Sequence, residues 1–131
     1  MRLNNPINLR QKVAQLLVIR ASGHASDSQR TYPQWELTNN QLQRLLKEGI
    51  GGVILFGGTI FELEQRCRTF KEWAVKPLLL SADIEEGLGQ RFKGGTWLAP
   101  PMTLGQIYLS NPLKAINLAE QYGCCVGSQA K

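Results

Sequence analysis

Two patterns of hydrophobic and polar positions alternate along the first 82 residues. Apolar side chains recur every three or four residues over 9–14, 38–49 and 61–75, as they do on the buried face of a helix. Thr38 is followed three residues later by Gln41, a capping-box signature that marks where the second of these segments begins. We therefore predict three amphipathic helices in these ranges.

A short apolar run follows each of these helices, at residues 15–19, 51–58 and 78–82. Runs of Leu, Val and Ile of this length are typical of strands that are buried on both faces, as in a parallel sheet. From the first run onward the order is strand, helix, strand, helix, strand. This alternation predicts βαβ units and an α/β fold with a parallel sheet.

The alternation of helices and strands is not expected to continue after Asp83. The sequence is rich in glycine from there to the pair Pro100–Pro101, and we expect irregular structure in this segment. A last helix is expected to begin at Pro112, because proline is favoured at the first helical position, and to run to Gly123 or beyond.

Length and charge narrow the class of protein. A chain of 131 residues is typical of one domain, and 43% hydrophobic residues are enough for a modest core. The 15 basic and 10 acidic residues are spread along the chain, which is typical of a solvated surface and not of a nucleic-acid site. No apolar run has the length of a membrane span, and residues 16–19 are too short for a signal-peptide core. We expect a cytoplasmic protein with neither a membrane nor a nucleic acid as partner.

The residues that most often hold metals or cofactors do not form a recognisable motif. The three cysteines lack zinc-site spacing and are expected to be reduced, and His24 lies in a polar segment typical of a surface loop. Gly57–Gly58 lacks the lysine of a phosphate-binding loop and is better explained as a tight turn. We expect no metal and no cofactor.

The segment from Asp83 to Arg91 is the best candidate for a binding site. Asp83 follows an apolar strand, and ligands of parallel α/β folds bind at the carboxyl ends of strands. A carboxylate accepts hydrogen bonds from two sugar hydroxyls, and a guanidinium donates several. An ordinary acidic turn that Arg91 neutralises explains the same spacing, so both interpretations stay open.

A second hypothesis makes Asp83 and Glu85 or Glu86 the carboxylate pair of a glycosidase. Such pairs stand about 5 to 9 Å apart on either side of the scissile bond. Residues two apart on one strand reach that distance, but they do not naturally flank a bond from opposite sides. The spacing favours substrate binding over catalysis for these acids.

Five blocks of sequence, in this order, carry a resemblance to a known family. They are Leu9–Leu17, Gly49–Phe56, Pro77–Leu80, Asp83–Phe92 and Pro100–Gly105. Together they resemble the N-terminal domain of glycoside hydrolase family 3, which includes β-glucosidases and β-N-acetylhexosaminidases. The resemblance implies a (β/α)8 barrel and retaining, exo-acting hydrolysis of β-linked sugars. It also implies that Asp83 and Arg91 bind the terminal sugar.

The sequence departs from the family in the residues of one motif and in its length. Glu86–Gly87 stands where the family usually has two glycines, and Leu88–Gly89 where Arg-Val is common. A barrel of this kind needs about 250 residues, and no segment here matches the family's Lys-His motif, acid/base residue or nucleophile. We therefore expect residues 1–131 to be an incomplete N-terminal part of the barrel, about three βα units long, with no catalytic residue of its own.

Two functions follow from this interpretation. In the first, the chain supplies part of the sugar site of a β-glycosidase that releases a terminal glucose or N-acetylglucosamine, with the missing half of the barrel as its partner. In the second, it is a non-catalytic fragment or interaction module that keeps only the half-barrel fold.

Overall fold

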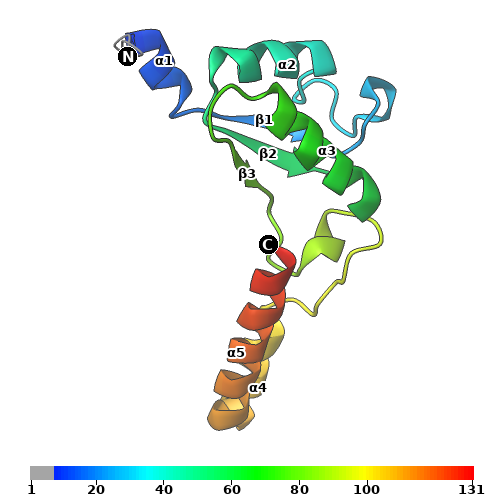
Figure 1. The fold of residues 1–131 in the computed structure, drawn as a ribbon. Coiled ribbons are helices and arrows are strands. Elements are labelled where there is room, and N and C mark those ends of the chain that lie inside the picture. Colours follow the sequence, from blue (N-terminus) through cyan, green and yellow to red (C-terminus); the bar gives the residue numbers. More distant parts are fainter. Residues whose placement is uncertain (1–7) are drawn as a thin grey trace. The chain divides into compact units, whose positions relative to one another are not determined.

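The computed structural model describes residues 8–131, which form two compact units, and the boundary along the chain falls between Ala82 and Asp83. The first unit holds a parallel sheet with its helices, and the second holds an irregular segment and a pair of helices (Figure 1). The predicted α/β class is confirmed.

Three parallel strands form the sheet of the first unit. They are β1 (Val18–Ser22), β2 (Gly52–Phe56) and β3 (Leu79–Ser81), in the order β1-β2-β3. β2 is the central strand, and its Gly52 pairs with Val18 on one side and Leu79 on the other. The predicted parallel sheet is therefore present, with sequential strands as neighbours.

The three predicted helices of this unit are also present. They are α1 (Leu9–Ala14), α2 (Asn39–Glu48) and α3 (Ile60–Trp73). Asn8, Thr38 and Thr59 each form a capping box with the residue three positions later. Gly49 ends α2 with a left-handed φ of 92°, a conformation that glycine adopts without steric cost.

The core of the first unit lies on one face of the sheet. Ala21, Val53 and Leu55 are almost fully buried on that face, as are Leu46 of α2 and Phe70 of α3. α2 and α3 pack beside each other (Figure 1).

The opposite face of the sheet differs from the prediction that all three strands are buried on both faces. Val18 and Leu79 flank Gly52 on that face, and their side chains are 50% and 60% exposed. The apolar composition of a run does not distinguish a strand covered on one face from one covered on both, which explains the error.

The first strand also begins later than residues 15–19 predict. Gln15 closes α1, and Leu16 and Leu17 continue it as a turn, with the Leu16 N–H donating to Val13 O at 3.0 Å. β1 then continues through Arg20 to Ser22, because its partner β2 continues as far as Phe56.

The second unit contains the short 3-10 helix η2 (Leu88–Gln90) followed by α4 (Met102–Ser110) and α5 (Pro112–Gln129). α5 begins at Pro112 as predicted, and Asn111 caps it by accepting the Lys114 N–H. α4 was not predicted, since its sequence is apolar on most sides and lacks the periodicity of an amphipathic helix. None of the helices within residues 8–131 combines the length and apolarity that a membrane crossing requires.

Candidate functional site

The first turn of the second unit brings the two predicted sugar-binding residues together. The Nε–H of Arg91 donates a hydrogen bond to the main-chain oxygen of Asp83 at 3.1 Å. Both residues are exposed to solvent. The eight-residue separation therefore closes into a loop that presents a carboxylate and a guanidinium from neighbouring positions.

Gly87 makes this loop possible. Its φ is 85°, and a Cβ at this position would lie 2.7 Å from the main-chain oxygen of Thr96. The Gly87 N–H donates to Ile84 O at 2.9 Å, which closes a tight turn before η2. Phe92, directly after Arg91, is completely buried and fixes the end of the loop. The loop is thus anchored on both sides of its polar residues.

Glu86, one member of the alternative carboxylate pair, is engaged within the loop. Its Oε2 accepts a hydrogen bond from the Trp97 indole at 2.6 Å, and its main-chain oxygen accepts one from the Leu98 N–H at 2.7 Å. Its own N–H donates to the side chain of Gln90. These bonds give Glu86 a role in holding the loop, which the sequence did not indicate.

Two residues of α5 hold the loop from the other side. The Tyr122 hydroxyl lies 2.9 Å from the main-chain oxygen of Glu85 and 3.0 Å from that of Ala99, and Gln129 Oε1 accepts the Leu88 N–H at 2.7 Å. Partial burial raises the pKa of Tyr122, and the carboxylates of Glu86 and Glu85 add to the rise. Sequence reasoning missed both anchors. Their separation of seven residues, which places them on one face of a helix, was the only available signal.

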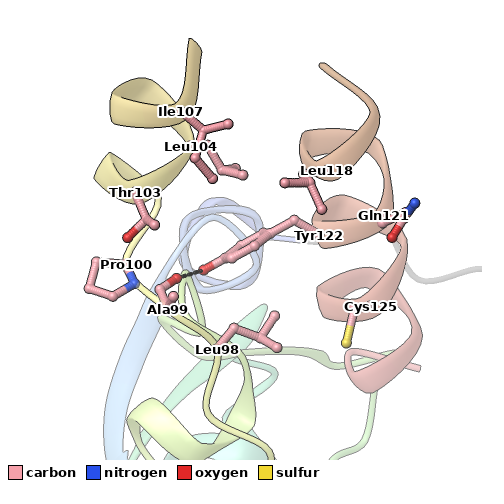
Figure 2. Close-up of a pocket in the computed structure, with 10 residues that line it drawn as sticks. All are labelled: Leu98, Ala99, Pro100, Thr103, Leu104, Ile107, Leu118, Gln121, Tyr122 and Cys125. Carbon is pink, nitrogen blue, oxygen red and sulfur yellow. Dashed lines mark hydrogen bonds between the residues drawn. The ribbon is translucent and has the colours of Figure 1, made fainter. Parts of the chain in front are cut away.

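An open groove of about 410 Å³ lies between α4 and α5. Figure 2 shows Tyr122 crossing it, with its hydroxyl bonded to Ala99. The lining residues are mostly apolar: Leu98, Ala99, Pro100, Thr103, Leu104, Ile107, Leu118, Gln121, Tyr122 and Cys125. Because none of them is charged, recognition of sugar hydroxyls fits the Asp83–Arg91 loop better than this groove.

His24 occupies the loop after β1, as the sequence predicted for a polar segment, but it is partly buried. Its Nδ1 lies 3.3 Å from Oε1 of Glu62 in the first turn of α3. No cluster of three or more His, Cys, Asp or Glu side chains that suits a metal ion is present among residues 8–131.

Comparison with known proteins places these features in a family. The model of the glycosyl hydrolase family 3 N terminal domain matches residues 8–131. A β-hexosaminidase of Bordetella pertussis is 34% identical over 100 residues, which cover 72% of this chain and 28% of that protein. A β-hexosaminidase of Methylobacillus flagellatus is 36% identical over 101 residues, which cover 73% and 29%.

The alignment spans less than a third of the length of these relatives. The family model, by contrast, covers the chain from α1 to the end of α5, including the Asp83–Arg91 loop. The chain therefore belongs to glycosyl hydrolase family 3, within its N-terminal domain.

Proposed function

We propose that this chain supplies part of the sugar-binding site of a retaining, exo-acting β-glycosidase, and that its three-stranded sheet begins a (β/α)8 barrel. The substrate carries a terminal β-linked glucose or N-acetylglucosamine. The relatives are named β-hexosaminidases, and this name favours the aminosugar. Family membership supports the reaction class.

One contact carries the proposal within this chain. The hydrogen bond from Arg91 to the main chain of Asp83 holds an anionic and a cationic side chain at neighbouring exposed positions. A carboxylate there accepts hydrogen bonds from two vicinal hydroxyls, while the guanidinium donates to ring or substituent oxygens. Such paired recognition orients a sugar ring without performing chemistry on it.

The nucleophile and the general acid/base are proposed to come from outside these 131 residues. Retaining hydrolysis needs a carboxylate that attacks the anomeric carbon and a second group that protonates the leaving oxygen. Glu86 is engaged by Trp97, and no segment of the chain resembles the family's nucleophile or acid/base motifs. Asp83 and Arg91 therefore act in binding.

The test uses a polypeptide that joins these residues to the remainder of a family 3 catalytic domain. Asp83→Ala is expected to lower kcat/KM for nitrophenyl β-glycosides about 10- to 150-fold, because at least one charge-assisted hydrogen bond worth roughly 1.5–3 kcal/mol is lost. Glu120→Gln, which changes an exposed carboxylate on α5, is the matched control and should leave the rate unchanged. An unaltered kcat/KM in Asp83→Ala overturns the assignment.

A further inference from the structure

Trp97 presents an aromatic side chain to solvent in the same compact unit as Asp83 and Arg91. It is 67% exposed, although tryptophan is on average a highly buried residue. The Gly89 N–H donates to Thr96 O at 2.8 Å, and a Cβ at Gly89 would lie 2.7 Å from the main-chain nitrogen of Trp97. Gly89 precedes Arg91 by two residues, which span at most about 7 Å. Trp97 is therefore attached to a segment that runs directly beside the loop of the candidate site.

Glu86 fixes the orientation of the indole. The Nε1–H of Trp97 donates to Glu86 Oε2 at 2.6 Å, and Glu86 is itself held through its main chain by Leu98 and by the side chain of Gln90. The indole N–H lies in the plane of the ring, so this bond engages the edge of the ring and none of its two faces. A side chain that is already held in this way loses little further freedom when a ligand covers it.

Trp35 in the first unit shows that exposure alone does not produce this arrangement. It is 66% exposed, nearly as much as Trp97. No described residue accepts a hydrogen bond from its indole, and its main-chain N–H donates to Tyr32 O. The fixed ring and the neighbouring charged pair distinguish Trp97 from this equally exposed tryptophan.

The combination of a charged pair and an aromatic face matches the two kinds of surface on a β-gluco-configured sugar. Such a ring carries its hydroxyls at the equator, where a carboxylate and a guanidinium form hydrogen bonds with them. Its axial C–H groups make each face apolar. The face of an aromatic ring carries partial negative charge and attracts these C–H groups. Binding sites for small molecules commonly combine aromatic side chains with a few polar groups in this way.

We propose that Trp97 is the platform on which the apolar face of the sugar ring stacks, and that Glu86 is the residue that positions the indole. The same sugar is held at its hydroxyls by Asp83 and Arg91, so the inference rests on the proposed function for the class of ligand. It adds a contact that selects for a pyranose with an unbroken apolar face, such as glucose or N-acetylglucosamine.

The test titrates methyl N-acetyl-β-glucosaminide into the full chain and measures the dissociation constant from the amide signals of residues 83–91. The indole N–H signal of Trp97, identified by its absence in Trp97→Phe, should shift and saturate together with these amides. Trp97→Ala is expected to weaken binding about five- to tenfold, because the apolar contact is lost. Trp97→Phe keeps an aromatic face and should cost no more than about threefold. Trp35→Ala, which removes the equally exposed tryptophan, is the matched control and should leave the affinity unchanged.

The variants separate this inference from the proposed function. If the amides of residues 83–91 saturate and Trp97→Ala binds as tightly as the wild type, the platform is wrong and the sugar-binding function stands. If Trp97→Ala weakens binding and Asp83→Ala does not, the platform stands and the role of Asp83 is wrong. Equal losses in Trp97→Phe and Trp97→Ala overturn the platform, because they trace the effect to the bond with Glu86 and not to the ring face. The absence of any saturable shift in the wild type overturns both.

Discussion

The negative charge of Glu62 is stabilised by hydrogen bonds within the fold. The main-chain N–H of Thr59 lowers its pKa most, and the Thr59 hydroxyl and His24 lower it further, against the opposing effect of burial. A carboxylate at the start of a helix also interacts favourably with the helix dipole. The ionised form of Glu62 is therefore preferred in the folded state.

A folded-state pKa below the usual 4.5 makes Glu62 a source of pH-dependent stability. Its contribution is fully present above about pH 4.5 and is lost as the pH falls through the lower folded-state value. Glu62→Gln keeps a side chain able to form the capping box, so at pH 7 it should reduce the free energy of unfolding by only about 0.3–1 kcal/mol. Urea denaturation at pH 7 and pH 3 measures the difference, which should be smaller at pH 3 than at pH 7.

Glu64→Gln is the control for this prediction. Glu64 lies on the same helix and pairs with Arg68 at 2.8 Å, but both side chains are about 70% exposed. Exposed pairs of this kind contribute little, so the variant should match the wild type within a few tenths of a kcal/mol. A penalty in Glu62→Gln that is equal at pH 7 and pH 3 contradicts a role for its charge.

At the level of residues, the sequence indicated the candidate site but not what supports it. Asp83 and Arg91 stand out because a charged pair follows an apolar run. The contacts of Glu86 with Trp97 and of Glu85 with Tyr122 join positions 11 and 37 residues apart, and no local pattern encodes such pairings. The contact between His24 and Glu62, which are 38 residues apart, could not be predicted from the sequence for the same reason.

Among the elements, α5 matters most for the candidate site, because Tyr122 and Gln129 hold the loop that contains Asp83 and Arg91. The two main-chain oxygens next to the Tyr122 hydroxyl belong to Glu85 and Ala99, near the two ends of the segment that joins β3 to α4. Removing the hydroxyl leaves the aromatic packing and loosens the loop.

Tyr122→Phe should therefore increase amide hydrogen exchange within the segment that joins β3 to α4. The Gly89 and Leu98 N–H groups, which donate to Thr96 O and Glu86 O, are expected to exchange about three- to tenfold faster. Exchange measured by NMR in the full chain tests this. Tyr108→Phe, which alters an exposed tyrosine on α4, should leave both rates unchanged. Equal protection in Tyr122→Phe and the wild type means that the hydroxyl does not hold the loop.

The elements themselves were predicted where capping signals and periodicity agreed. α2 begins after Thr38 and ends at Gly49, as both signals indicated. β1 was displaced because Leu16 and Leu17 are as apolar as strand residues yet form a turn after α1. α4 was missed because helices that are apolar on most sides carry no amphipathic pattern.

On the scale of the whole molecule, one family model matches both of the compact units that the structure contains. The sheet with α1 to α3 and the loop with α4 and α5 form separate compact units, yet the family model covers both. Length and composition predicted one domain but gave no sign of this division. The residues proposed to bind the sugar, Asp83 and Arg91, both lie in the second unit.

Binding of an intact glycoside to the full chain tests the central claim most directly. Methyl N-acetyl-β-glucosaminide is titrated into the chain, and the dissociation constant is measured from the amide signals of residues 83–91. We predict saturable binding that Asp83→Ala weakens about 10- to 150-fold and Glu120→Gln leaves unchanged, with the glycoside recovered intact. Equal affinity in Asp83→Ala and the wild type, or release of free N-acetylglucosamine by the chain alone, would contradict a chain that binds the sugar through Asp83 and draws its catalytic groups from elsewhere.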